Sequence, residues 1–170
     1  GSTCANLLAQ WAFAAGAHRV TGIYRAPEHQ PVLARMGLEI IQISNRAQMM
    51  AAASSANIVF DALGGEPGSQ VLQAMPAGGD FVSYGLLTGQ PVRTGDPRPL
   101  ARHRRFHMRD SLAGMTPDQW RACFDTLWPR ISSTALPAVR KVRLADWKNA
   151  LAGYDQPGRP KPLLVFGDNA

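Results

Sequence analysis

The order of elements at the start of the chain is the strongest constraint on the fold. Residues 1–5 are small, residues 6–15 are mostly apolar, Gly16 follows, and Val20–Tyr24 reads as a strand. Small residues before a helix let backbone N–H groups approach a pyrophosphate, toward which the helix turns its positive end. Most of a βαβ unit is therefore present: a glycine-containing turn, a helix from Asn6 and a strand. Only a strand before Gly1 is missing from the unit. Taken alone, so short a turn more often marks an ordinary helix N-terminus.

The residues after this strand indicate which nucleotide would bind. In dinucleotide-binding folds a carboxylate at this point binds the 2′-hydroxyl of the adenosine ribose of NAD. Here Arg25 follows Tyr24, and no acid occurs before Glu28. Arginine offers a planar fork of donors that suits a 2′-phosphate, although a solvated arginine is common at a strand end. Together with the preceding turn, Arg25 predicts NADPH as the cofactor.

Strands and helices alternate through the first half of the chain. Further strands are predicted at 39–43, 57–63 and 80–84, and further helices at 28–36, 47–53 and 66–75. This alternation predicts an α/β fold with a doubly wound parallel sheet. Arg25, Gly64-Gly65 and Tyr84-Gly85 all follow strands, at the edge where ligands bind in such sheets, so one cofactor cleft is expected. Asp61 fits a residue that caps the following loop better than a ligand contact.

The second half of the chain begins with a long loop, residues 86–102, rich in Gly, Pro and Arg. Thr116 and Pro117 then have the residue types of an N-cap and a first helical position. We assign the aromatic and aliphatic residues that follow at helical spacing to the core; they are Trp120, Phe124, Leu127, Trp128 and Ile131. Strands at 139–142 and 161–166 and a helix at 144–152 complete the chain.

Composition and charge narrow the functional class. A length of 170 residues suits about one domain, and no apolar run approaches the ~20 residues that cross a bilayer, so no membrane partner is expected. The net charge is +6, and six arginines lie between residues 93 and 109 with His103 and His107. Such a cluster attracts phosphates, nucleic acid or acidic proteins, or it is a solvated loop.

The two cysteines, Cys4 and Cys123, lie far apart, and neither CxxC nor HExxH occurs. No metal is therefore expected within these residues, and a reducing compartment, the cytoplasm, is favoured. The chain lacks an initiator Met, which indicates that the protein's own N-terminus lies upstream, so a targeting sequence cannot be judged from these residues.

The order of the segments resembles the C-terminal half of the medium-chain dehydrogenase/reductase superfamily, in its zinc-free branch. Within that branch the chain is most similar to trans-2-enoyl thioester reductases. The segments that carry the resemblance are Gly1–Asn6, Tyr24-Arg25, Phe60–Gly65, Tyr84–Leu87 with Gln90–Val92, Phe106–Met108, Thr116–Trp120 and Pro160–Leu164. They span nearly the whole chain. Ala5 stands where the family usually has glycine, His107-Met108 replaces a bulkier Trp-Leu pair, and Ala26-Pro27 lacks a second arginine.

The resemblance implies cofactor contacts at matching positions. Gly1, Ser2, Thr3 and Cys4 match the pyrophosphate turn, and Tyr24-Arg25 matches the position of the 2′-phosphate. Tyr84, Gly85, Leu86 and Leu87 match the segment beside the ribose and nicotinamide. Phe106, His107 and Met108 match the backbone along the nicotinamide, and Lys161 matches a lysine near the cofactor. No catalytic residue is assigned, because the family's proton-donating tyrosine belongs to the part that would precede Gly1.

The resemblance also implies an architecture. Residues 1–135 would form an NADPH-binding Rossmann domain without its first strand, and residues 136–170 would return to an absent GroES-like barrel. Without that strand, the strands at 20–24 and 57–63 would expose apolar edges. The chain expressed alone is therefore expected to be aggregation-prone or only partly ordered, to show no turnover and to bind NADPH weakly if at all.

The activity implied is NADPH-dependent reduction of the carbon-carbon double bond of a trans-2-enoyl thioester carried by coenzyme A or acyl carrier protein. An acidic carrier protein and a homodimer of the intact protein are the implied partners. An NADPH:quinone oxidoreductase is the enzymatic alternative, and a non-catalytic NADPH-binding protein or remnant is the alternative of another class. A nucleic-acid binder is disfavoured, because no recognisable module or aromatic stacking platform occurs.

Overall fold

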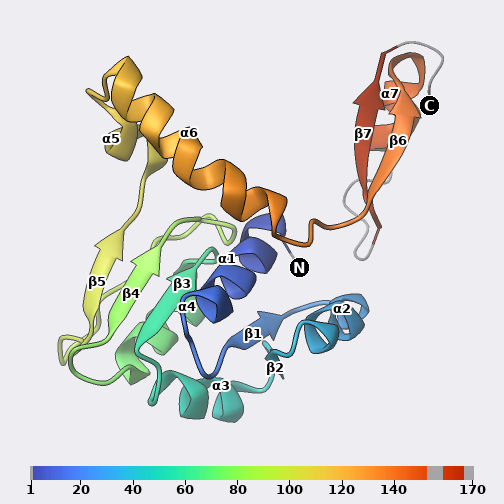
Figure 1. The fold of residues 1–170 in the computed structure, drawn as a ribbon. Helices are drawn as coiled ribbons and strands as arrows, with labels where there is room; N and C mark the ends of the chain where they lie inside the picture. The colour runs from blue at the N-terminus through green and yellow to red at the C-terminus, as the bar shows by residue number, and fades with distance from the viewer. Residues whose placement is uncertain (1, 153–158, 167–170) are drawn as a thin grey trace. The chain divides into compact units, whose positions relative to one another are not determined.

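The computed structural model describes residues 2–152 and 159–166 (Figure 1). Gly1, predicted to belong to the pyrophosphate turn, lies outside these residues. The chain divides into two compact units: unit 1 comprises residues Gly1–Gln42 and Asp125–Ala170, and unit 2 comprises Ile43–Phe124. Every strand pair within them is parallel, so the predicted α/β class is confirmed. None of the helices in the described residues is long and apolar enough to span a membrane.

Unit 1 begins with a helix, a strand and a helical connection to a second strand. The elements are α1 (Thr3–Ala14), β1 (Thr21–Tyr24), η1 (Pro27–His29), α2 (Gln30–Arg35) and β2 (Glu39–Gln42). β1 and β2 pair in register from Thr21↔Glu39 to Tyr24↔Gln42. A small core of Ala9, Leu33 and Leu38 packs α1 and α2 against these strands.

The start of α1 differs from the prediction. The helix begins at Thr3 rather than at Asn6, so Thr3 and Cys4 lie in its first turn and not in a loop before it. The physical reason is the side chain of Ser2, whose hydroxyl accepts the Ala5 N–H at 3.2 Å and thereby caps the helix. Gly16 has a φ of +92° just past the helix end, which is the conformation that glycine adopts most readily there.

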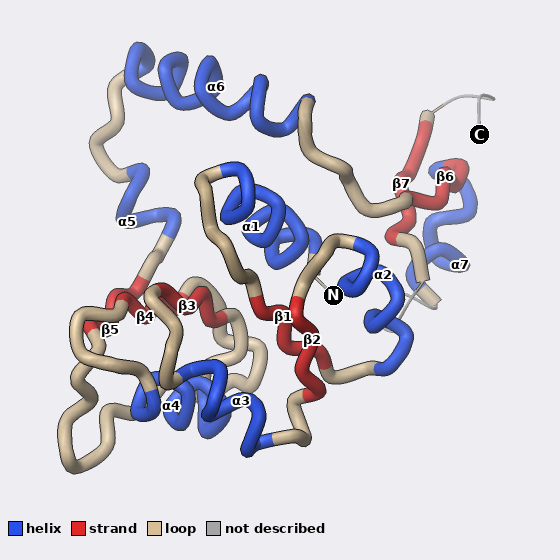
Figure 2. Tube along the Cα trace, turned by 60° about the horizontal axis from the view of Figure 1, so that its bottom comes forward, coloured by secondary structure: helices blue, strands red, loops and turns tan. Residues whose placement is uncertain are grey.

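The C-terminal part of unit 1 contains the end of α6 (Pro117–Ser132), β6 (Val139–Arg143), η2 (Leu144–Asp146), α7 (Trp147–Leu151) and β7 (Lys161–Val165). β6 and β7 form a parallel pair that starts at Val139↔Lys161, with α7 against it (Figure 2). The residues after α6 are anchored to α1. Gln10 donates to the Ala135 carbonyl and accepts the Ala135 N–H, both at 2.9 Å, and the Trp11 indole donates to Thr134 Oγ1 at 2.9 Å.

Unit 2 is a three-stranded sheet with helices. Its elements are α3 (Arg46–Ala53), β3 (Ile58–Asp61), α4 (Gly65–Ala74), β4 (Asp80–Ser83), β5 (Arg102–Arg105), α5 (Met108–Leu112) and the start of α6. The strand order is β3-β4-β5, and α3 and α4 lie against each other (Figure 2). Its core contains Leu72, Met75, Phe81 and Ala101, and the side chains of Leu72 and Phe81 are fully buried.

The sheet orders fit the two halves of a doubly wound sheet. In the order 3-2-1-4-5-6, the pair β2-β1 corresponds to positions 3-2 and the row β3-β4-β5 to positions 4-5-6. Within the described residues no strand fills position 1, and β1 and β3 each have a single strand neighbour. Apolar side chains are exposed on both strands: Ile23 of β1 is 38% exposed, and Ile58 and Phe60 of β3 are 51% and 42% exposed.

Two predictions about the second half need correction. No described residue of α6 is buried, so the residues assigned to the core are not core residues of this chain; Trp120, Phe124 and Trp128 are 37%, 44% and 57% exposed. The rings of Trp120 and Phe124 stack on each other at 5.9 Å instead of inserting into a core. In addition, residues 102–105 of the arginine-rich stretch form the strand β5, which their composition does not indicate.

Candidate functional site

The N-terminus of α1 carries three of the predicted pyrophosphate-binding residues. Ser2 has an extended backbone and caps the helix, while Thr3 and Cys4 occupy its first turn. The first N–H groups of a helix have no acceptor within the helix, and the dipole makes this end favourable for an anion. The first turn contains no acidic side chain that would oppose such an anion.

The carboxyl end of β1 places Tyr24 and Arg25 in different surroundings. Tyr24 packs against the core of Ala9, Leu33 and Leu38, whereas Arg25 is exposed in the bend that follows the strand. Within the described residues no ion pair engages Arg25. Its guanidinium is therefore free to meet an anionic ligand.

Lys161 lies elsewhere in unit 1. It is the first residue of β7, opposite Val139, and its side chain is exposed. In the described part of the chain, no hydrogen bond or ion pair joins Lys161 to Arg25 or to the start of α1.

In unit 2, Asp61 organises the loop after β3. This carboxylate is 7% exposed and accepts the N–H groups of Leu63 and Gly64, each at 3.0 Å. Burial raises the pKa of Asp61, and the two backbone N–H bonds oppose that rise by stabilising the charged form. The expected role of Asp61 as a loop cap is confirmed.

This loop is joined to the loop after β4. The N–H groups of Leu87 and Thr88 donate to the carbonyls of Ala62 and Leu63 at 3.0 Å, and the Gly65 N–H donates to the Gln90 carbonyl at 2.7 Å. We call residues 61–65 and 84–90 the ledge. These bonds join the two loops of the ledge.

Two glycines are required by the close approach within the ledge. Gly64 has a φ of +66°, and a Cβ on it would lie 2.4 Å from the Gln90 carbonyl oxygen. A Cβ on Gly85 would lie 2.7 Å from the Ala62 carbonyl oxygen. Any side chain at either position would push the two loops apart.

The structure brings together the predicted residues of unit 2. Tyr84, Gly85, Leu86 and Leu87 follow β4, and Phe106, His107 and Met108 follow the neighbouring strand β5. The Phe106 N–H donates to the Ser83 carbonyl at 2.8 Å, so both segments leave the sheet at the same edge. Leu87 is 74% and Met108 is 65% exposed. Leu87 on the ledge and Met108 after β5 are therefore exposed apolar residues at this edge of the sheet.

A polar pair that sequence reasoning missed lies next to this edge. Ser83 Oγ is 2.9 Å from His103 Nε2, and the ring of Phe81 meets the His103 ring edge-on. Burial lowers the pKa of His103, and the nearby Arg105 lowers it further. His103 is therefore neutral at pH 7. No local signal could have found this pair, because β5 itself is not indicated by its sequence.

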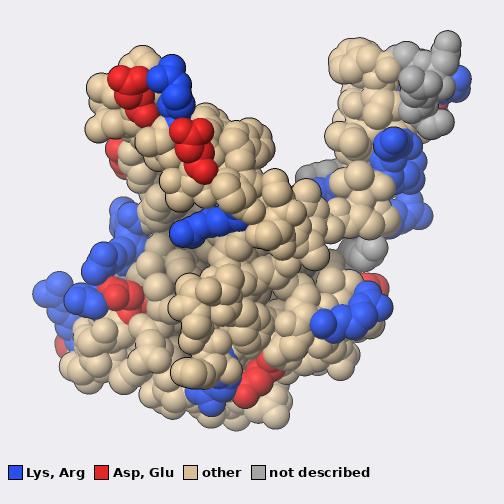
Figure 3. All heavy atoms as spheres, in the orientation of Figure 1, with Lys and Arg blue, Asp and Glu red and all other residues tan. Residues whose placement is uncertain are grey.

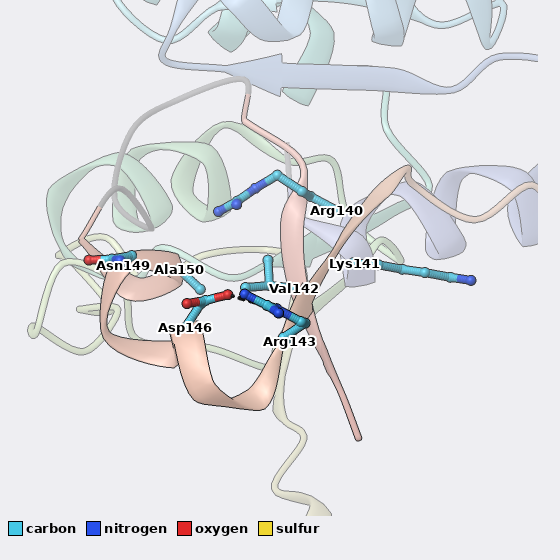
Figure 4. Close-up of a pocket in the computed structure, with 7 residues that line it drawn as sticks. All are labelled: Arg140, Lys141, Val142, Arg143, Asp146, Asn149 and Ala150. Carbon is cyan, nitrogen blue, oxygen red and sulfur yellow. Dashed lines mark hydrogen bonds and ion pairs between the residues drawn. The ribbon is translucent and has the colours of Figure 1, made fainter. Parts of the chain in front are cut away.

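Two surface depressions lie outside the predicted residues. One, of about 620 Å³, is formed by β6 and α7, and there Arg143 and Asp146 point toward each other at 3.2 Å (Figure 4). The other, of about 430 Å³, is formed in unit 2 by residues 94 and 98–103. Neither depression contains a residue predicted to bind the cofactor.

The described residues do not offer a metal site. Across residues 2–152 and 159–166, no group of three or more His, Cys, Asp or Glu side chains is placed to hold an ion. Cys4 and Cys123 are both free thiols on the surface.

Parallel strands with helical connections and ligand-facing loops at their carboxyl ends define a Rossmann-type domain. The chain belongs to the zinc-binding dehydrogenase family, whose model matches residues 5–132. The predicted membership of the medium-chain dehydrogenase/reductase superfamily is thereby confirmed. The described residues nevertheless do not fit a zinc ion.

Solved structures show the same fold. A protein assigned as an NADPH:quinone reductase from Bacillus thuringiensis matches with a TM-score of 0.77 and 22% identity over 98% of this chain and 54% of its own. A mutant enoyl thioester reductase from Candida tropicalis matches with a TM-score of 0.72 and 12% identity, over 96% of this chain and 51% of its own. A complex of Etr1p with NADP and crotonyl-CoA matches with a TM-score of 0.66 and 12% identity, over 96% of this chain and 49% of its own. The chain thus spans about half of these proteins. No curated protein sequence matched it.

Proposed function

We propose that this chain forms the NADPH-binding half of a reductase that acts on the carbon-carbon double bond of a trans-2-enoyl thioester. The observation that carries the proposal is Arg25, an exposed guanidinium without an ion pair in the described residues, directly after β1 and with no acid before Glu28. An arginine at this position favours a 2′-phosphate over a free 2′-hydroxyl. The similar complex of Etr1p with NADP and crotonyl-CoA supports the same cofactor and substrate class.

The donors present fit a phosphorylated dinucleotide. We assign the pyrophosphate to the N-terminus of α1, residues Ser2–Cys4, and the 2′-phosphate to Arg25. Leu86 and Leu87 on the ledge, with Phe106 and Met108 after β5, would provide the apolar surface against which a flat nicotinamide ring packs. We assign Lys161 as a second positively charged side chain near the cofactor. Because hydrogen bonds already fix the ledge, little conformational entropy would be lost on binding there.

The cofactor, when bound, supplies a hydride to the β-carbon of the enoyl thioester. The chain's own task is to hold and aim the reacting face and to exclude water from it. The proton for the α-carbon must come from another group, which we place outside residues 1–170. We likewise assign residues 1–135 to the cofactor domain and residues 136–170 to a segment that returns to the other half, and we propose that the intact protein is a homodimer.

A second candidate is an NADPH:quinone reductase. The similarity to the Bacillus thuringiensis protein favours a quinone reductase, since that protein has the highest TM-score and sequence identity of the three structures compared above. A quinone would need the same cofactor half with a different pocket.

A comparison of two substrates, measured with the intact protein, separates the enoyl thioester reductase from the quinone reductase. NADPH consumption is measured with crotonyl-CoA and with a benzoquinone, and the thioester product is analysed for loss of its double bond. We expect faster turnover of crotonyl-CoA and a saturated product. Turnover of the quinone alone would establish the second candidate, and NADPH binding without turnover of either would indicate a non-catalytic binding protein.

A further inference from the structure

His107 lies at the carboxyl edge of the sheet in unit 2, where the ledge also begins. The Phe106 N–H donates to the Ser83 carbonyl at 2.8 Å, so the chain is still anchored to β4 one residue before His107. Ligands of parallel α/β sheets bind at this edge. In the ledge and in residues 106–108, His107 is the one side chain that can carry a positive charge.

Both the backbone and the ring of His107 are held in place. Its carbonyl accepts the N–H groups of Asp110 and Ser111 at 3.1 Å and the Ser111 hydroxyl at 3.2 Å. Its Nδ1 lies 3.4 Å from Oδ1 of Asp110. The other ring nitrogen, Nε2, has no hydrogen-bond partner in the described residues. When the ring is protonated, Nε2 therefore offers an N–H donor to a ligand.

The surroundings of this ring suit an acyl thioester better than a polyanion. Phe106 and Met108, on either side of His107 in the sequence, are exposed apolar residues, as is Leu87 on the ledge. In Figure 3, acidic as well as basic side chains lie around α5 and the start of α6, so no general attraction for anions is expected there. A directed N–H donor with apolar neighbours fits a neutral carbonyl that becomes negative during a reaction.

We propose that Nε2 of His107 donates a hydrogen bond to the carbonyl oxygen of the enoyl thioester and that Asp110 is its positioning residue, an inference that rests on the proposed reductase function. Hydride addition at the β-carbon moves the electron pair of the C=C bond toward the carbonyl, whose oxygen becomes that of an enolate. The bond from His107 is stronger to this negative oxygen than to the neutral carbonyl, so it lowers the barrier to hydride transfer. His107 keeps its own proton, and the α-carbon receives one from the donor placed outside residues 1–170.

The test measures hydride transfer from NADPH to crotonyl-CoA in a single turnover of the intact protein at saturating substrate. His107→Ala removes the donor, and Asp110→Ala removes the carboxylate that orients it. Arg109→Ala is the matched control, because it removes an exposed cation from the same short helix, α5. Calorimetry with acetoacetyl-CoA, a stable thioester that forms an enolate, gives a second measurement that does not depend on turnover.

We expect His107→Ala to slow hydride transfer about a hundredfold and to weaken acetoacetyl-CoA binding about tenfold, because each depends on a negative oxygen. Its affinity for NADPH and its melting temperature should stay nearly unchanged, since an exposed ion pair adds little stability. Added imidazole should restore part of the rate in His107→Ala alone. Asp110→Ala should lose less of the rate at the same melting temperature, and Arg109→Ala should match the wild type.

Two results would overturn the role of His107 while leaving the proposed function intact. One is an equal rate of hydride transfer in the wild type and in His107→Ala, and the other is an equal loss of rate in His107→Ala and Arg109→Ala. A wild-type protein that does not reduce crotonyl-CoA would overturn the proposed function together with this role.

Discussion

The hydroxyl oxygen of Ser83 lies 2.9 Å from Nε2 of His103, so a hydrogen bond joins the carboxyl end of β4 to the middle of β5. His103 is partly buried there, with Phe81 against its ring and Arg105 as a charged neighbour. Burial and the positive charge of Arg105 both lower the pKa of His103, and the negative charge of Asp61 opposes them only in part. The pair therefore places a neutral histidine inside the sheet that carries the ledge.

This histidine should make stability depend on pH. The pKa of His103 is lowered in the folded protein, so above its ordinary value of 6.5 it is neutral in both the folded and the unfolded state. As the pH falls below 6.5, the unfolded chain binds the proton first, and the free energy of unfolding decreases until the pH passes the folded pKa. His103→Gln should make this acid-side slope shallower, as measured by denaturant unfolding of the intact protein between about pH 7.5 and about pH 5. Part of the slope should remain, because burial also lowers the pKa of His29. The exposed His107→Gln is the control and should keep the whole slope. An unchanged slope in His103→Gln would contradict the assignment.

Asp61 should stabilise the loop after β3 through its two acceptor oxygens. In Asp61→Ala both oxygens are lost, so the N–H groups of Leu63 and Gly64 lose their carboxylate acceptors. Leaving a buried N–H without an acceptor should cost about 1–3 kcal/mol of the free energy of unfolding. Asp96→Ala, an exposed change in the same unit, should cost much less. Equal effects of the two substitutions would show that the bonds of Asp61 add nothing.

Gly64→Ala should destabilise the ledge more than a change at another glycine of positive φ. Gly78 has a φ of +83° with open space around it, so Gly78→Ala meets only backbone strain, of about 1–2 kcal/mol. Gly64→Ala meets similar strain and also a Cβ placed 2.4 Å from the Gln90 carbonyl oxygen, so the loss should exceed about 3 kcal/mol. Thermal unfolding of both variants of the intact protein gives the comparison. Similar melting temperatures would mean that the two loops of the ledge separate easily.

Much of the fold could be predicted because apolar runs and punctuating glycines agree. The apolar residues of β3 followed by Asp61 and two glycines indicate a buried parallel strand, a cap and a tight turn. The parallel strand, the cap and the turn are found, but the strand is not buried, because Ile58 and Phe60 are exposed. Thr116 was predicted as a helix cap, and its hydroxyl accepts the Gln119 N–H at 3.3 Å while its own N–H donates to Gln119 Oε1 at 2.8 Å.

The failures have a common physical cause, which is that local sequence does not encode what a segment meets in space. The spacing of Trp120, Phe124 and Trp128 shows that they share a helix face but not whether anything covers it. The arginines of β5 do not favour a strand; they form one because β4 offers a pairing edge and Asp80 holds two of them. The Ser83–His103 pair depends on that same register.

The most direct test of the proposed function is a titration of NADPH and NADH into the intact protein and its Arg25→Ala variant. A charge-assisted hydrogen bond to the 2′-phosphate contributes about 1.5–3 kcal/mol, so the variant should bind NADPH roughly tenfold to a hundredfold more weakly. Its affinity for NADH should barely change, because NADH has no 2′-phosphate. Wild-type protein that binds both nucleotides equally, or equal losses for the two in Arg25→Ala, would contradict the account.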